Sequence, residues 1–174
     1  MKSIVTGILI IIGLSLSVSA YSQFNYHDAS TWLLGELSPD MLQEPPHMEW
    51  YNRGFDEYNP DLAPVGTLIS IDKSDVSITI VMGTWCPDTR REFPRFMKLM
   101  ALWGFPLENI RIIGVDSNKK APLGDYDLLD IKKVPTFIIY KNKVEAGRII
   151  EYPVTSLERD LVDILGKTEL TKTK

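Results

Sequence analysis

Cysteine and histidine are scarce in this sequence of 174 residues, which contains one Cys and two His. A single Cys cannot form a disulfide within one molecule, so the disulfide-rich scaffolds of small secreted proteins are excluded. One Cys and two His are also too few for the usual zinc frameworks. Positive charge is not in excess either. The formal net charge is −4, which argues against a nucleic-acid-binding protein.

Other signals of function are absent as well. The sequence has no internal repeat, no Gly-rich phosphate loop, no Ser–His–Asp arrangement and no metal motif, so it predicts neither a metal nor an organic cofactor. His27 and His47 have no acid or Cys nearby that would suggest a ligand set, and we expect both to be surface histidines. The composition, with 44% hydrophobic and 24% charged residues, is that of a globular protein.

The first 20 residues have the layout of a secretory signal peptide. Lys2 precedes an apolar run over residues 4–18, and small residues follow up to Ala20. We therefore predict cleavage after Ala20, or alternatively after Ser22, and export to the periplasm or the extracellular space. An uncleaved membrane anchor is the alternative, but the run is shorter than the ~20 residues that span a bilayer.

Residues 21–61 are predicted to form an N-terminal extension. A first group of residues has helical spacing, namely Trp32, Leu33, Leu34 and Leu37. The stretch 48–58 carries four aromatic residues at spacings that predict a helix with an aromatic face, and such a face usually packs into a core.

Residues 62–166 are predicted to form the main domain, followed by a polar tail over 167–174. Short apolar runs predict strands over 77–83, 110–115, 137–140 and 144–150. Helical patterns cover 87–103 and a last helix that begins after Ser156 and ends at Gly166. This order predicts an α/β fold with a central mixed sheet flanked by helices on both faces.

Cys86 lies where a predicted strand ends and a predicted helix begins. Pro87 is suited to the first turn of a helix, because its missing N–H would be unpaired there in any case. The free N–H groups and the positive end of the helix dipole favour a thiolate at this position. Arg90 and Arg91 add positive charge nearby. The sequence therefore makes Cys86 the candidate nucleophile.

Several positions together resemble the thioredoxin superfamily over residues 75–166. Trp85-Cys86 matches the start of its active-site helix, Pro94 matches the proline that kinks that helix, and Val134-Pro135-Thr136 matches its cis-proline segment. Residues 137–142 resemble the strand and hairpin that follow. The resemblance implies a thioredoxin-like fold in which Pro135 is cis and faces the Cys86 sulfur. It also implies that Trp85, Val134 and Pro135 contact an extended substrate chain, with the Val134 backbone pairing to it as an added strand.

The sequence departs from the family at two important positions. Thr89 stands where the family has its second cysteine, and Ile80 stands where thioredoxin has a buried acid. A dithiol cycle within one molecule is therefore impossible, and any redox turnover must use one thiol. We expect the Thr89 hydroxyl to donate a hydrogen bond to the Cys86 thiolate, with Pro87 shaping the same helix terminus.

These observations predict an exported monothiol thioredoxin-like protein that acts as a thiol–disulfide oxidoreductase through Cys86. Its expected partners are exported protein or peptide clients and an external reducing thiol or reductase, with membrane contact only if the signal segment stays uncleaved. The alternative is a non-catalytic binding module in which Cys86 is idle. A third possibility, a thiol-dependent peroxidase, fits less well, because such members of the superfamily place a Thr three residues before the cysteine rather than after it. A basic patch for an anionic partner is also conceivable, from Arg90, Arg91, Arg95, Lys132 and Lys133.

Overall fold

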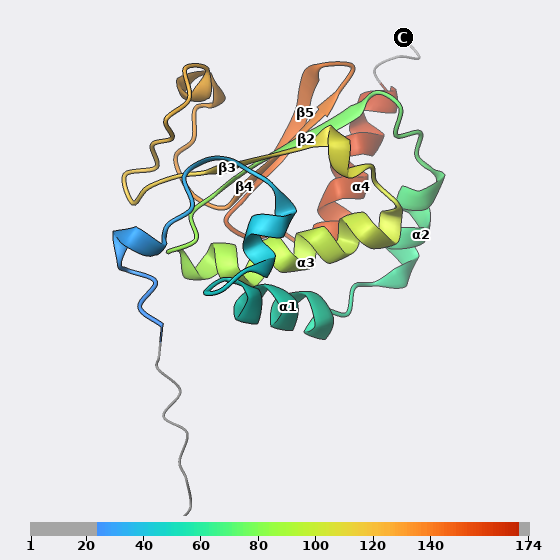
Figure 1. Ribbon diagram of the computed structural model, residues 1–174. Helices are drawn as coiled ribbons and strands as arrows, with labels where there is room; N and C mark the ends of the chain where they lie inside the picture. The colour runs from blue at the N-terminus through green and yellow to red at the C-terminus, as the bar shows by residue number, and fades with distance from the viewer. Residues whose placement is uncertain (1–23, 171–174) are drawn as a thin grey trace, which may run out of the picture.

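A computed structural model describes residues 24–170 of the chain (Figure 1). The predicted signal peptide lies outside these residues. The four α-helices of the described part are α1 (Met48–Glu57), α2 (Leu62–Ser70), α3 (Pro87–Trp103) and α4 (Leu157–Leu170). Its strands are β1 (Gly35–Leu37), β2 (Val76–Met82), β3 (Ile110–Gly114), β4 (Thr136–Lys141) and β5 (Val144–Ile150). Four short 3₁₀ helices are η1 (Ala29–Thr31), η2 (Pro39–Gln43), η3 (Leu107–Asn109) and η4 (Tyr126–Leu129).

The strands form one mixed sheet in the order β1-β3-β2-β4-β5. β2 is the central strand and pairs in parallel with β3 and antiparallel with β4, so that Ile80 lies opposite Ile112 on one side and Phe137 on the other. The α3 helix connects the two parallel strands, as such a crossover requires. The α/β class and the mixed sheet that the sequence predicts are confirmed.

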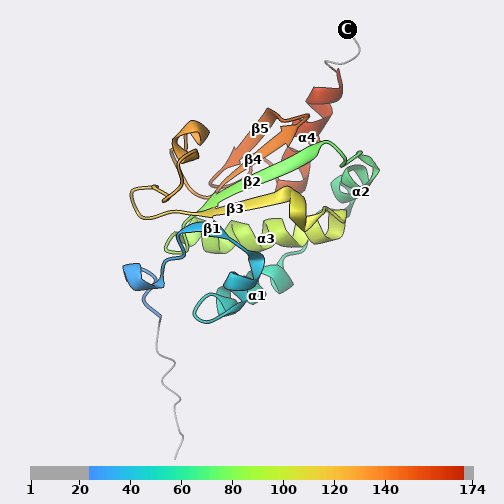
Figure 2. The same cartoon turned by 45° about the horizontal axis from the view of Figure 1, so that its top comes forward.

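All four α-helices pack on the same face of the sheet, where the main core lies (Figures 1 and 2). Side chains alternate between the two faces along a strand. Ile80 therefore points into the core with the helices, whereas its neighbour Val81 belongs to a second cluster that contains no residue from the interior of an α-helix. This arrangement differs from the expected one, in which helices cover both faces.

The face of the sheet opposite to the α-helices is covered at one end by a long connection over residues 116–133. This connection contains η4 but no α-helix. Two sheet arginines hold it there. Arg111 of β3 pairs with Asp125 at 2.9 Å, and Arg148 of β5 donates to the Leu129 carbonyl at 3.1 Å. Because the connection runs from β3 to the segment before β4, its anchoring on this face helps fix the backbone around Val134.

The α1 helix packs across α3 at its proline. Pro94 lies inside α3, as the resemblance implied, and Gly54 of α1 approaches its ring so closely that an added Cβ would lie 2.5 Å from Pro94 Cγ. The aromatic face of α1 is core, as predicted. Trp50 and Tyr51 are buried, and the Tyr51 ring lies 6.0 Å from that of Phe93.

Three elements differ from the sequence prediction. The predicted helical stretch around residues 32–37 is β1, because Gly35 has a positive φ of 84° and the segment pairs with the open edge of β3. The α2 helix was not predicted, since Pro64 and Gly66 obscure its apolar pattern. The α4 helix continues through Gly166, because an internal glycine costs only about 1 kcal/mol relative to alanine.

Within residues 24–170, no helix is both long enough and apolar enough to span a bilayer.

Candidate functional site

Cys86 is the N-cap residue of α3, directly after the turn that follows β2. Its N–H donates to the Gly83 carbonyl at 2.9 Å, and its own carbonyl accepts from Arg90 N–H at 3.1 Å. Pro87 occupies the first helical turn, as the sequence predicts. The side chain is 7% exposed, so only a small part of it reaches solvent.

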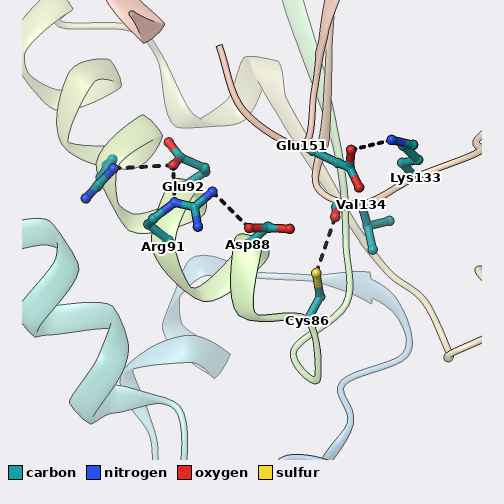
Figure 3. Close-up of polar contacts among 8 residues, drawn as sticks. Cys86, Asp88, Arg91, Glu92, Lys133, Val134 and Glu151 are labelled. Atoms are coloured by element: carbon teal, nitrogen blue, oxygen red, sulfur yellow. Dashed lines mark hydrogen bonds and ion pairs between the residues drawn. The ribbon is translucent and has the colours of Figure 1, made fainter.

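The Cys86 sulfur faces the segment that carries Pro135. The Val134–Pro135 peptide bond is cis, as the resemblance implied, and Cys86 Sγ donates a hydrogen bond to the Val134 carbonyl at 3.3 Å (Figure 3). Val134 is itself buried. The structure therefore brings together Cys86, Val134 and Pro135.

Trp85 is fixed on the rim of the site. Its indole N–H donates to the Val115 carbonyl at 2.9 Å, and its ring lies 6.2 Å from that of Trp32 in the N-terminal extension. Trp85 remains partly exposed beside Cys86. A partly buried indole held at both ends offers a rigid apolar surface next to the sulfur.

Thr89 lies one turn into α3 and is fully buried. Its hydroxyl oxygen accepts the Gly83 N–H at 3.4 Å, which ties the first turn of the helix to the end of β2. The expected bond from this hydroxyl to the Cys86 thiolate stays a prediction.

Arg90 is a residue of the site whose role the sequence did not reveal. Its Nη1 atom donates to the Trp85 carbonyl at 2.8 Å and to the Thr84 carbonyl at 3.1 Å, and its guanidinium carbon lies 4.3 Å from the centre of the Tyr26 ring. Burial lowers the pKa of Arg90, while Tyr26 and Cys86 act in the opposite direction. From the sequence, Arg90 was one positive charge among several. Its contacts could not be predicted, because they are made with backbone carbonyls and with a tyrosine that is distant in sequence.

Carboxylates pair with four of the five basic residues that were considered as a patch. Those ion pairs are Arg91 with Asp88 at 2.8 Å and Glu92 at 2.6 Å, Arg95 with Glu92 at 3.3 Å, Lys132 with Asp130 at 2.5 Å, and Lys133 with Glu151 at 2.6 Å. Figure 3 shows the Asp88–Arg91 and Lys133–Glu151 pairs on either side of Cys86. The surroundings of the sulfur thus carry charges of both signs.

The first part of the extension, which we call the N-terminal strap (residues 24–47), lies against the Cys86 turn. The Leu33 N–H donates to Thr84 Oγ1 at 3.3 Å, next to the Trp32–Trp85 ring contact. Within the strap, the Trp32 indole N–H donates to the Tyr26 carbonyl at 2.9 Å. The strap therefore forms one wall of the site.

His47 closes the strap and is not a surface residue as expected. It is 2% exposed, and its Nδ1 is a buried atom without a hydrogen-bond partner. Burial lowers the pKa of His47, a bond to the Thr31 backbone raises it, and the positive charge of Arg90 lowers it further. The expectation was wrong because His47 packs against the rings of Tyr26 and Trp50 in the folded chain. No local sequence pattern predicts this packing.

No group of three or more His, Cys, Asp or Glu side chains within residues 24–170 is arranged to hold a metal ion.

Comparisons with known proteins identify similar folds but no family. No protein-family model and no curated protein matches the chain. A solved protein of unknown function from Pseudomonas aeruginosa matches 74% of this chain and 87% of its own length, with 15% identity and a TM-score of 0.52. An HIV epitope scaffold of solved structure matches 83% of this chain and 95% of its own, with 16% identity and a TM-score of 0.53. Mitochondrial thioredoxin 3 from Saccharomyces cerevisiae matches 63% of this chain and 98% of its own, with 22% identity and a TM-score of 0.39.

At these identities the matches concern the fold alone. The mixed sheet with helices, in which a cysteine at the start of α3 faces a cis-proline before β4, is consistent with the thioredoxin-like fold that the resemblance implied. The likeness says nothing of activity.

Proposed function

We propose that the protein exchanges thiols and disulfides with exported protein or peptide clients through the single thiol of Cys86. The observation that supports this most directly is the position of Cys86 Sγ at the N-terminus of α3, 3.3 Å from the Val134 carbonyl beside cis-Pro135. A helix N-terminus favours the thiolate, which is the reactive form of a cysteine.

The chemistry needs one protein sulfur and one external thiol. The Cys86 thiol gives its proton to solvent, and the thiolate attacks one sulfur of a client disulfide. A mixed disulfide forms between Cys86 and the client, and the second client sulfur leaves as a thiolate. An external thiolate then attacks the client sulfur of the mixed disulfide, which releases the Cys86 thiolate and leaves the client joined to the external thiol. Thr89 carries no sulfur, so this second step cannot occur within the chain.

The proposed place for the client is the backbone at Val134. The Val134 carbonyl receives the Cys86 S–H in the free protein, and an N–H of an extended client segment would replace that donor and release the sulfur. Tyr152 is 60% exposed and follows Glu151, whose N–H donates to the Pro135 carbonyl at 2.7 Å. Trp85 and Tyr152 would then flank the bound segment with apolar surface. Export, as the first 20 residues predict, would bring the protein to clients with disulfides.

The test is direct trapping of the mixed disulfide. The chain from residue 21 onward, without reductant, is incubated with an extended peptide that carries one disulfide, and the products are separated without reduction and weighed by mass spectrometry. We expect one peptide chain attached to Cys86, its release by an added thiol, and no adduct with Cys86→Ser. An unmodified protein after prolonged incubation, together with a folded Cys86→Ser control, would contradict the proposal.

A non-catalytic binding module is the second candidate, and one observation favours it. Cys86 is 7% exposed and its S–H already has an acceptor. This arrangement fits a thiol that never reacts as well as one that reacts only after a client binds. A cysteine-free peptide distinguishes the two functions. If Cys86→Ser binds it as tightly as the unchanged protein while no mixed disulfide forms with the disulfide peptide, the binding module is the better description.

A further inference from the structure

Arg90 connects three parts of the site that are distant in sequence or in role. One nitrogen of its guanidinium holds the two carbonyls that precede Cys86, those of Thr84 and Trp85. The carbon of the same guanidinium lies over the ring of Tyr26, 4.3 Å from its centre. The Tyr26 hydroxyl in turn donates to the Pro46 carbonyl at 3.0 Å, so this ring is fixed inside the N-terminal strap.

These contacts have an electrostatic consequence at the sulfur. Both carbonyls belong to the turn directly before Cys86, so the guanidinium that holds them is placed beside this turn. Arg90 occupies both carbonyls and adds a full positive charge that is half-buried, where charges interact more strongly than in water. Within residues 24–170 Arg90 is also the member of the expected basic patch that has no carboxylate partner, so its charge is not cancelled locally.

We infer that Arg90 is a positioning residue that fixes the Cys86 turn against the N-terminal strap and favours the thiolate of Cys86. Tyr26 supports it by holding the guanidinium in place. The strap therefore has a second role besides packing, because its Tyr26 ring contacts the Arg90 guanidinium. The inference rests on the proposed function for its biological use, but it concerns the reactivity of the sulfur itself.

The same helix contains a matched control. Arg95 lies five residues further along α3, about 7.5 Å at 1.5 Å per residue. Its guanidinium also faces a tyrosine ring, with its carbon 5.6 Å from the centre of Tyr58, and it pairs with Glu92. Removing Arg95 therefore tests the general effect of losing an arginine–tyrosine contact from α3, without changing the carbonyls beside Cys86.

The experiment measures the rate at which iodoacetamide, a small neutral reagent, alkylates Cys86 between pH 5 and 10. Because the chain has one Cys, the modified mass reports this residue alone. We expect Arg90→Met to slow alkylation at pH 7 by about tenfold and to move the rise of the rate to higher pH. Arg90→Lys keeps the charge and should recover most of the pH profile. Tyr26→Leu should slow the reaction about threefold, whereas Tyr26→Phe keeps the ring and should not.

The inference is overturned if Arg90→Met keeps the rate and pH profile of the unchanged protein, or if Arg95→Met slows the reaction by the same factor. Near-ultraviolet circular dichroism shows whether each variant is folded. If Arg90→Met does not fold, the Arg90→Lys variant and the Tyr26 pair decide the question. Because iodoacetamide is not a client, absence of mixed disulfides in the trapping experiment would contradict the proposed function and leave this result unchanged.

Discussion

His47 illustrates, at the scale of one residue, how the fold shifts a pKa. The imidazole is buried beneath the Tyr26 and Trp50 rings, near the permanent charge of Arg90. One nitrogen bonds to the Thr31 backbone and the other, Nδ1, has no partner. A second positive charge here would be desolvated and repelled, so burial and the Arg90 charge hold the pKa of His47 below its ordinary value.

This lowered pKa predicts a stability that depends on pH. The pKa of His47 is lower in the folded protein than the 6.5 of an unperturbed histidine, so the unfolded chain binds a proton that the folded protein excludes. The stabilising effect is complete above pH 6.5 and is lost as the pH falls from there toward the folded-state pKa. Urea unfolding at several pH values should show this fall as the pH decreases below 6.5.

The two histidines provide the comparison for that measurement. His47→Gln should reduce the pH dependence of the free energy of unfolding in this window, whereas the exposed His27→Gln should not. Equal pH dependence in the His47→Gln variant and the unchanged protein would show that His47 is not the group responsible.

Single residues also show what the sequence can and cannot reveal about the site. Cys86 and Pro135 could be predicted, because a helix start and a Val-Pro-Thr segment are local patterns. Arg90 could be predicted only as one of the positive charges near Cys86, and neither its contacts nor the burial of His47 could be predicted. Their roles depend on contacts with residues up to 64 positions away, such as that between Arg90 and Tyr26, and the sequence gives only their types.

At the scale of elements, the α1–α3 contact depends on a glycine at one position. Gly54 of α1 lies against the rigid ring of Pro94, with no room for a Cβ atom. Alanine usually stabilises a helix interior by about 1 kcal/mol relative to glycine. Here overpacking against a ring that cannot rotate away costs about 1–3 kcal/mol and outweighs that gain.

We therefore predict that Gly54→Ala lowers the free energy of unfolding by about 1 kcal/mol. Gly66→Ala in α2 is the matched control, because nothing lies within 4 Å of its added Cβ atom, and it should leave stability equal or higher. Chemical denaturation of both variants measures the difference. If the Gly54→Ala protein were more stable than the parent, α1 and α3 would be able to move apart without a loss of packing energy, and the prediction would be wrong.

Elements with regular patterns were predictable, and those defined by their partners were not. The β2, β4 and β5 strands and the α3 helix follow apolar runs and a clear Pro87 start, and the structure places them within a residue or two of the prediction. β1 is only three residues long and exists because the β3 edge offers it a partner. No sequence pattern in three residues specifies such a pairing.

The whole molecule does not divide where the sequence pattern changes. The main domain was predicted to begin at residue 62, but residues before it contribute to the same core as α3 and the sheet, among them Leu42, Trp50 and Tyr51. The strap also pairs with the edge of β3 through β1, and it forms one wall of the Cys86 site. All four α-helices of the described chain share one face of the sheet, so losing α1 would expose the outer side of α3.

A chain that begins at Leu62 should therefore fail to fold on its own, whereas one that begins at Phe24 should unfold cooperatively. Truncating one large buried aromatic side chain typically costs about 3–5 kcal/mol, and a domain's whole stability is about 5–15 kcal/mol. Removing Leu42, Trp50 and Tyr51 together, with the helix that carries two of them, costs more free energy than the whole stability of a domain. Circular dichroism during urea titration compares the two chains. A sigmoidal transition in the chain from Leu62 would show that the thioredoxin-like part is independent, and the strap would then be an accessory to the Cys86 site rather than part of its foundation.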